Sequence, residues 1–241
     1  MPELAIVIPT YNESKNIKPL VARLDQTLDG VDWQVLFVDD DSPDKTADVV
    51  TELGQSHARV ACLKRVGEKG LSSACIAGMR HVRAPVYAIM DADLQHDETR
   101  LPLMLEQIRA GADLCIGTRY SSGGSVGEWG MVRQVISRSA TWMTNFLLGT
   151  RLSDPMSGFF MVTDTVMHHV FKDLEGQGFK ILLDIVVHAR QDIVIREVPF
   201  TFRPRVAGES KLRLSVIVAL LVFLAKKAPR RLMQRIFPDH H

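Results

Sequence analysis

Apolar and polar positions alternate in blocks through the first half of the chain. Short apolar runs occupy residues 4–8, 35–38, 60–63, 86–90 and 114–116. Between them, apolar residues recur at helical spacing, which predicts helices over residues 15–28, 45–53, 71–82 and 101–109. Continuous apolar strands separated by amphipathic helices are typical of a parallel sheet that is covered on both faces. We therefore expect an α/β, Rossmann-like fold with a mostly parallel sheet, whose first strand ends at Pro9.

The second half of the chain has a different pattern. A Ser- and Gly-rich loop over residues 121–125 precedes a helix-period segment over 132–147, which we expect to end at Gly149. Further elements are expected as strands over residues 159–162 and 193–202 and helices over residues 180–189 and 211–227. The sequence contains no internal repeat and no interdomain linker. We therefore predict one domain over residues 1–210 and a helical appendage over residues 211–241.

Composition excludes several classes of protein. Lys and Arg number 29 and Asp and Glu number 28, so no net charge attracts nucleic acid. The three cysteines, Cys62, Cys75 and Cys115, lie far apart, which favours buried free thiols in a reducing compartment. No basic segment precedes the first apolar run, and the longest apolar stretch, residues 214–225, is too short to cross a bilayer. We therefore expect a cytoplasmic protein that can also bind a membrane surface.

Three polar clusters follow predicted strands at the point where each strand ends. They cover residues 9–13, 39–44 and 91–96. Asp and Ser also cap helices, so one such cluster could be structural. Three clusters at the carboxyl ends of parallel strands would meet at one edge of the sheet, which is where ligands bind in open α/β folds. We expect the functional site at this edge.

Asp91-Ala92-Asp93 is the clearest candidate for a metal site. Two carboxylates at this spacing after a strand can chelate a hard cation, and Gln95 can add an amide oxygen. Mg²⁺ or Mn²⁺ held by few protein oxygens keeps coordination positions for a diphosphate. The alternative is a solvated acidic loop. A second stretch, residues 67–70, could offer backbone N–H groups to an anion or could be a simple turn.

Five segments carry a resemblance to a known family. They read Ile8-Pro9-Thr10-Tyr11-Asn12-Glu13, Val38-Asp39-Asp40-Asp41-Ser42-Pro43-Asp44, Met90-Asp91-Ala92-Asp93-Leu94-Gln95-His96, Gly117-Thr118-Arg119-Tyr120 and Arg205-Val206-Ala207-Gly208-Glu209-Ser210-Lys211. In this order they resemble the dolichol- and polyprenol-phosphate mannose synthases, which are family-2 glycosyltransferases with an A-type fold. One position departs from that pattern, because Asp97 follows His96 where a proline is more usual, and we expect it to open a helix.

The resemblance implies roles for single residues. The base and ribose pocket would be formed by Pro9, Tyr11, Glu13, Val38 and Asp40. The metal and the donor diphosphate would be bound by Asp91, Asp93 and Gln95, with Ala92 also contacting the donor. The donor diphosphate and the acceptor phosphate would be bound by Arg119, Arg205 and Lys211. A reaction between two phosphates needs such cations, and arginine suits bidentate contact with phosphate.

The resemblance also implies the reaction. An oxygen of a polyprenyl phosphate would attack the anomeric carbon of a nucleotide-sugar in line, and the nucleoside diphosphate would leave on Mg²⁺ or Mn²⁺ with inversion at that carbon. A phosphate is already ionised at neutral pH, so no general base is required, and catalysis rests on positioning and charge stabilisation. GDP-mannose is the favoured donor, and UDP-glucose is the alternative.

Two rival functions stay open. The first is a family-2 transferase that acts on a soluble or polysaccharide acceptor, against which the Arg205–Lys211 motif and the absence of a Q-x-x-R-W pattern argue. The second is a nucleotide-sugar-binding regulator without activity, against which the intact set of Asp91, Asp93 and Gln95 argues.

Asp154 lies in a segment that the resemblance places near the acceptor. It could position the acceptor or orient Arg133 or Arg138, and it could equally cap a turn before Pro155.

Two segments are candidates for contact with the membrane that would hold a lipid acceptor. Residues 132–147 carry Trp142, and residues 214–224 precede a basic cluster, so both segments suit interfacial helices on an anionic membrane. The alternative is that both helices pack in the core. We expect peripheral association with the inner face of the membrane, with a membrane-protein partner as a further way to reach the bilayer.

Overall fold

The computed structural model describes residues 1–121, 123–125, 131–176, 178, 180–190, 192–203, 222, 224 and 225, and only the backbone of residues 131–136. Arg205, Lys211 and most of the appendage predicted over residues 211–241 lie outside this part of the chain.

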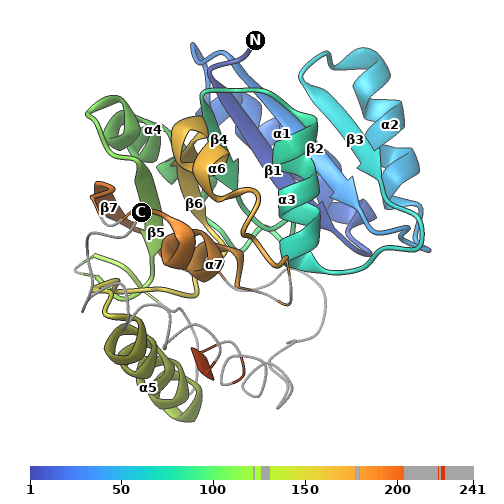
Figure 1. Cartoon of the computed structure of the whole chain (residues 1–241). Coiled ribbons are helices and arrows are strands. Elements are labelled where there is room, and N and C mark those ends of the chain that lie inside the picture. The colour runs from blue at the N-terminus through green and yellow to red at the C-terminus, as the bar shows by residue number, and fades with distance from the viewer. Residues whose placement is uncertain are drawn as a thin grey trace.

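The described residues form a seven-stranded sheet of order β3-β2-β1-β4-β6-β5-β7. The strands are β1 (Leu4–Thr10), β2 (Trp33–Asp39), β3 (Val60–Lys64), β4 (Val86–Ile89), β5 (Leu114–Thr118), β6 (Phe160–Thr163) and β7 (Ile195–Pro199). All neighbours are parallel except β6, which runs antiparallel to both β4 and β5. The mostly parallel α/β sheet is therefore confirmed (Figure 1).

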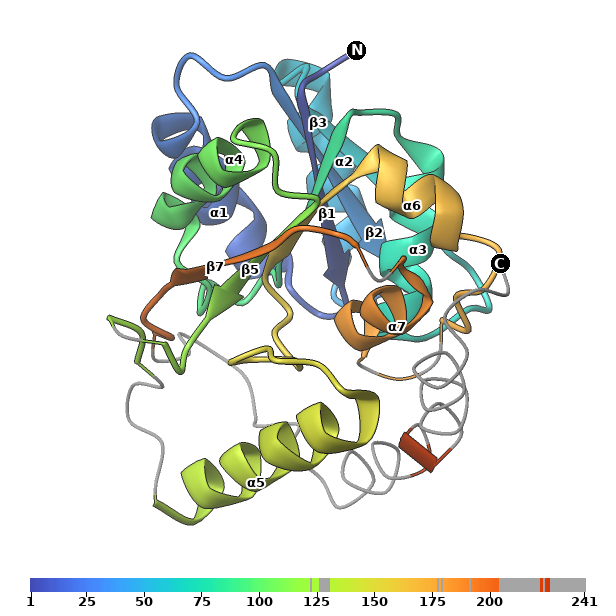
Figure 2. The same cartoon turned by 60° about the vertical axis from the view of Figure 1, so that its left-hand side comes forward.

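Helices cover both faces of the sheet, as expected. They are α1 (Ser14–Thr27), α2 (Thr46–Ser56), α3 (Leu71–His81), α4 (Leu101–Arg109), α5 (Met131–Leu148), α6 (Asp164–Val170) and α7 (Ile181–His188), with a 3₁₀ turn η1 (Glu98–Arg100). Side chains alternate along each strand, so Ile6 and Ile8 of β1 contact the core under α1, α2 and α4. Ala5 and Val7 contact the core on the other face. That face is covered by α3, α6 and α7 (Figure 2).

Helix α3 lies unusually close to the sheet. A Cβ at Gly78 would approach Cγ1 of Val7 to 2.4 Å and Cγ2 of Val38 to 2.9 Å, so only glycine fits. This contact also buries the side chain of Val38 completely.

Several predicted boundaries were wrong. Strand β1 continues through Pro9 to Thr10. Its pairing with β4 ends at Val7, so the missing N–H of Pro9 removes no hydrogen bond between β1 and β4. Strand β7 is shorter than predicted, ending at Pro199. Helix α6 was not predicted; it is seven residues long and begins where the Thr163 side chain accepts a hydrogen bond from the N–H of Val166.

Helix α5 lies apart from the two layers, below the carboxyl edge of the sheet (Figures 1 and 2). It ends as predicted, with Gly149 at a φ of 65°. Its Leu148 is buried with Leu183 and Val187 of α7 and with Leu224. None of the described helices has the length and apolar character needed to span a bilayer.

The cysteines are free, as predicted. Cys75 and Cys115 are buried and Cys62 is half-buried. Burial raises the pKa of Cys62 to about 11 and that of Cys115 to about 12, so both thiols stay protonated and unreactive at neutral pH.

Candidate functional site

The three polar clusters meet at the carboxyl edge of the sheet. Strands β1, β2 and β4 are adjacent and parallel, so the loops that follow them leave the sheet side by side. The first two loops are bonded directly, because the N–H of Asn12 donates to Oγ of Ser42 at 3.0 Å and the N–H of Glu13 donates to Oγ1 of Thr46 at 3.0 Å. The predicted convergence of these two clusters is confirmed.

Backbone strain concentrates in the same loops. Among the described residues, the non-glycine residues with positive φ are Asn12, Asp41, Lys45 and Leu94, at 62°, 53°, 65° and 61°. Each lies in the loop that follows β1, β2 or β4. Such conformations persist where surrounding contacts hold them, and they cluster at functional sites.

Asp39 organises the loop after β2. Its carboxylate is fully buried and accepts hydrogen bonds from the N–H of Ser42 at 2.9 Å, from Oγ of Ser42 at 2.6 Å and from Oγ1 of Thr10 at 3.2 Å. The carboxylate therefore holds the two loops together rather than facing a ligand.

Asp40, predicted to contact the donor, holds a third loop. Its Oδ1 accepts from Nε and Nη2 of Arg65 at 2.8 and 2.5 Å, and its Oδ2 accepts from the N–H of Gly70 at 2.8 Å. Gly67 and Gly70 have positive φ, and Gly70 donates to this carboxylate, which favours the turn interpretation of residues 67–70. No role for Arg65 was predicted, although an arginine directly after a strand at this edge was the available signal.

The remaining residues of the predicted base and ribose pocket surround this loop. Tyr11 is exposed, and Nζ of Lys69 lies 5.8 Å from the centre of its ring. Oε2 of Glu13 accepts from Nδ2 of Asn16 at 2.7 Å. Pro9 is half-buried at the end of β1, whereas Val38 can offer a ligand only its backbone, because its side chain is in the core.

The predicted metal ligands follow β4. The side chain of Asp91 is 37% exposed, while Asp93 is buried and its Oδ1 accepts from the N–H of Gln95 at 3.2 Å. Nε2 of Gln95 donates to the carbonyl of Arg203 at 2.9 Å, which fixes the orientation of the carboxamide. Ala92 is buried between the two aspartates.

This donor set fits a hard divalent cation. The described residues contain no group of three His, Cys, Asp or Glu side chains that could enclose a metal. Two carboxylates and one amide are the sparse oxygen ligands that Mg²⁺ or Mn²⁺ accepts when a substrate supplies the others.

His96 is hydrogen-bonded to the backbone of Asp91, a role that the sequence did not suggest. Its Nδ1 accepts from the N–H of Asp91 at 3.0 Å, so the ring proton is on Nε2. The ring stacks on Phe159 at 5.2 Å and meets the edges of Phe200 and Phe202. Burial lowers the pKa of His96 to about 4, so the imidazole is neutral at physiological pH.

Arg119 is held by Asp154. Nε and Nη2 of Arg119 donate to the two oxygens of this buried carboxylate at 2.7 and 2.8 Å. Burial alone would lower the pKa of Arg119, but the hydrogen bonds and charge of Asp154 raise it. The sequence offered Arg133 or Arg138 as the partner of Asp154; Arg138 is exposed and the side chain of Arg133 lies outside the described part, so that prediction missed the observed pair.

The turn at Asp154 is also present, because its carbonyl accepts from the N–H of Ser157 at 3.1 Å. Next to Arg119, the hydroxyl of Tyr120 donates to Oγ of Ser137 on α5 at 2.7 Å. This bond ties α5 to the same edge of the sheet.

Asp97 behaves as predicted and opens η1, with its side chain accepting from the N–H of Thr99. Asp97 and Glu98 also bind Arg203, whose Nη2 and Nη1 donate to them at 2.7 and 2.6 Å. No role for Arg203 was predicted.

Comparisons with known proteins show the family of the chain. Residues 5–171 match the model of a family described as glycosyl transferase family 2. The chain is 41% identical to the dolichol-phosphate mannosyltransferase of Pyrococcus furiosus, over 88% of this chain and 59% of that protein. It therefore spans less than two thirds of the length of that relative.

Two further relatives are covered more fully. The dolichol-phosphate mannosyltransferase of Saccharomyces cerevisiae is 37% identical over 91% of this chain and 84% of its own length. That of Mycosarcoma maydis is 36% identical over 88% of this chain and 74% of its own length.

Solved structures agree on the fold. Glucosyl-3-phosphoglycerate synthase from Mycobacterium tuberculosis, in complex with Mn²⁺, UDP-glucose and glycerol 3-phosphate, superposes with a TM-score of 0.69. The alignment covers 95% of this chain and 80% of that chain at 14% identity, which supports the fold alone. The expected A-type fold is confirmed.

Proposed function

This chain belongs to glycosyl transferase family 2, and we propose that it transfers mannose from GDP-mannose to a polyprenyl phosphate, with inversion at the anomeric carbon and with Mg²⁺ or Mn²⁺ bound. The observation that carries the proposal is the pair of Asp91 and Asp93 at the carboxyl edge of the sheet. The names of three relatives, all dolichol-phosphate mannosyltransferases, support the donor sugar and the lipid acceptor.

The donor would lie across the edge where the loops after β1, β2 and β4 meet. Tyr11, Glu13 and Asp40 would surround the nucleoside, beside the backbone of Pro9 and Val38. Asp91, Asp93 and Gln95 would hold the divalent cation, which when bound supplies positive charge beside the donor diphosphate. The diphosphate would thus be fixed at the end of β4.

Arg119 would bind phosphate at the reacting centre, with Arg205 and Lys211 from the segment outside the described residues. The bidentate contact with Asp154 fixes the plane of the Arg119 guanidinium before substrate binds. Such preorganised charge is effective because little reorganisation is needed as the transition state forms.

In the transfer step, an oxygen of the acceptor phosphate forms a bond to the anomeric carbon, and the bond from that carbon to the donor diphosphate breaks. The nucleoside diphosphate takes the electron pair. The acceptor phosphate is already ionised, so the protein has to position the two phosphates and offset their charge.

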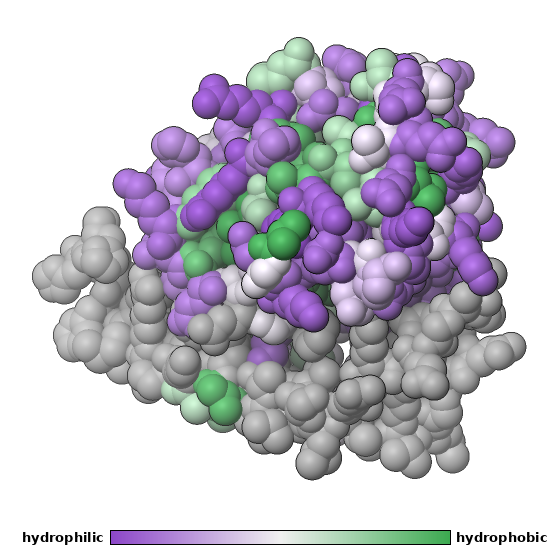
Figure 3. Space-filling model, turned by 90° about the vertical axis from the view of Figure 1, so that its right-hand side faces the viewer, coloured by the Kyte–Doolittle hydropathy of each residue, from purple (hydrophilic) through white to green (hydrophobic). Residues whose placement is uncertain are grey.

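Membrane association would bring the protein to its acceptor. On α5, Trp142 and Phe146 are 69% and 70% exposed and stack on each other at 5.5 Å. The surface over α2 and β3 is, by contrast, mostly hydrophilic (Figure 3). Because α5 lies beside the site, this exposed aromatic pair would place the carboxyl edge near the headgroups on the inner face of the membrane.

A donor and acceptor panel tests the proposal. The purified protein is incubated with GDP-mannose or UDP-glucose and with a short polyprenyl phosphate or 3-phosphoglycerate, with Mn²⁺ or with EDTA. Mannose transfer to the lipid that requires the metal is expected. Transfer of glucose, or transfer to 3-phosphoglycerate instead of the lipid, would replace the proposal with the corresponding rival.

A further inference from the structure

Arg203 connects two parts of the site that are distant in the sequence. Its backbone N–H donates to the carbonyl of Gln95 at 3.0 Å, and its own carbonyl accepts from Nε2 of Gln95 at 2.9 Å. Its guanidinium donates to Glu98 at 2.6 Å and to Asp97 at 2.7 Å. The loop after β4 is thus bound to the chain after β7 through four hydrogen bonds at one residue.

The two carboxylates in this contact are themselves fixed. The side chain of Glu98 is 6% exposed and that of Asp97 is 11% exposed. Asp97 also accepts from Oγ1 of Thr99 at 2.7 Å, and Glu98 lies 3.7 Å from Arg23 of α1. Partly buried, charge-assisted hydrogen bonds of this kind are stronger than exposed ion pairs, so the guanidinium is held firmly.

The residues before Arg203 are held as well. The N–H of Phe200 donates to the carbonyl of Thr118 at 3.0 Å, and the N–H of Phe202 donates to the carbonyl of Ser125 at 2.9 Å. The ring of Phe202 lies 5.5 Å from the guanidinium of Arg119 and 5.8 Å from the ring of His96. Residues 200–203 therefore contact both Arg119 and His96, the residue that accepts a hydrogen bond from the N–H of Asp91.

We infer that Arg203 is a positioning residue for the proposed metal site, because its four hydrogen bonds hold the loop that carries Gln95 against the chain after β7. This inference rests on the proposed roles of Asp91, Asp93 and Gln95 at the metal and the donor diphosphate.

The test separates diphosphate binding from nucleoside binding. Arg203→Ala removes both ion pairs and leaves the backbone bonds to Gln95. The nucleoside contacts on β1 and β2 are untouched, so guanosine or uridine affinity should stay within about twofold of wild type. Because misplaced charges lose their effect within about an ångström, affinity for the matching diphosphate, GDP or UDP with Mn²⁺, should fall about tenfold.

Arg203→Lys keeps one charge that can reach one carboxylate, so it should recover part of the lost diphosphate affinity. A matched control is Arg109→Ala, which removes a similar bidentate pair with Glu3, at 2.8 and 2.7 Å, away from the carboxyl edge. The control should leave both affinities unchanged. Thermal unfolding of all variants identifies any that fail to fold.

Folded Arg203→Ala protein that binds the diphosphate as tightly as wild type would overturn the inference. An equal loss of nucleoside and diphosphate affinity would also overturn it, because that pattern indicates a general structural role. These binding measurements use no acceptor, so wild-type protein that binds a diphosphate but fails to mannosylate a polyprenyl phosphate would contradict the proposed function alone.

Discussion

The backbone N–H of Asp91 donates to Nδ1 of His96 at 3.0 Å, and the buried ring of His96 stacks on Phe159. The first predicted metal ligand is therefore fixed by a neutral ring five residues further along the chain. Such support behind a metal ligand commonly alters metal affinity as much as it alters stability.

His96→Leu should leave the N–H of Asp91 without this acceptor, whereas His96→Asn can replace Nδ1 with its amide oxygen. We expect the leucine variant to lose about 1–3 kcal/mol of unfolding free energy and to bind Mn²⁺ more weakly, with the asparagine variant between it and wild type. Urea unfolding and Mn²⁺ titration measure both quantities. Unchanged Mn²⁺ affinity in the leucine variant would show that Asp91 needs no such support.

The metal carboxylates can be tested one at a time. Asp91→Asn and Asp93→Asn each remove one negative oxygen from a site that has few ligands, so transfer should fall to background while the fold is kept. Circular dichroism and a transfer assay with and without EDTA measure this. Asp41→Asn is the control, because Asp41 is an exposed residue of the neighbouring loop that pairs with Lys64. Wild-type activity that survives excess EDTA would remove the metal from the mechanism.

Asp154→Asn should weaken the fold and the site together. The substitution leaves the guanidinium of Arg119, which is 12% exposed, without its buried counter-charge. Removing one partner of a buried ion pair costs about 3–5 kcal/mol. The exposed pair of Arg190 and Asp192 supplies a control, since Asp192→Asn should hardly change stability. Equal effects of the two variants in chemical denaturation would contradict this expectation.

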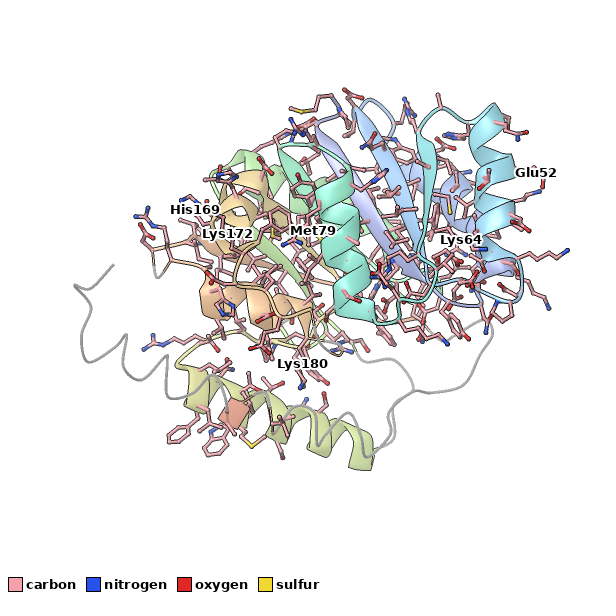
Figure 4. The ribbon with its side chains drawn as sticks, turned by 45° about the vertical axis from the view of Figure 1, so that its right-hand side comes forward. Glu52, Lys64, Met79, His169, Lys172 and Lys180 are labelled. Atoms are coloured by element: carbon pink, nitrogen blue, oxygen red, sulfur yellow. The ribbon has the colours of Figure 1, made fainter. Side chains whose placement is uncertain are left out.

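The stability of the protein should depend on pH through Lys180. It lies at the start of α7, on the side that faces α5 (Figure 4), and burial lowers its pKa from 10.5 to about 8. Between these two values the unfolded chain holds more protons than the folded one, so stability from this group rises with pH. Below pH 8 Lys180 is protonated in both the folded and the unfolded chain, so burial of its charge lowers the free energy of unfolding by its full amount.

Lys180→Met keeps an unbranched side chain and removes the charge. The variant should therefore be more stable than wild type at pH 7, and the difference should shrink as pH rises toward 10. Denaturation at both pH values gives the difference directly. A difference that does not change with pH would mean that Lys180 is not deprotonated in this range.

Membrane binding should depend on the aromatic pair of α5. Trp142→Ser with Phe146→Ser should reduce flotation with anionic liposomes without changing stability, because both side chains are largely exposed. Val66→Ser, at a residue that is 72% exposed in the loop after β3, is the control. Flotation of the double variant at the wild-type level would assign any membrane contact to other residues.

Local patterns account for the part of the site that was predicted. The loops after β1, β2 and β4 were found because buried strands read as apolar runs and parallel strands end at one edge. The partners within the site were missed because they lie far apart in the sequence. Arg119 and Asp154 are separated by 35 residues, and Arg203 and Asp97 by 106.

The order of the strands in the sheet could not be predicted from the sequence either. An apolar run predicts a strand but not its neighbours, so nothing in residues 160–163 indicated that β6 runs antiparallel between β4 and β5. Helix α6 was missed for a different reason, since seven residues hold too few turns for a helical period to be visible.

The position of β6 has a consequence for synthesis of the chain. Strands β1 to β4 can join as soon as residue 89 has left the ribosome, since in the described part of the chain they pair with one another and with β6 alone. Among the described strands, β5 pairs with β6 and β7 alone, so it has no partner among them until residues 160–163 emerge. A nascent chain would thus form the nucleoside half of the sheet early, while the edge of β4 and both edges of β5 stay open to wrong pairing.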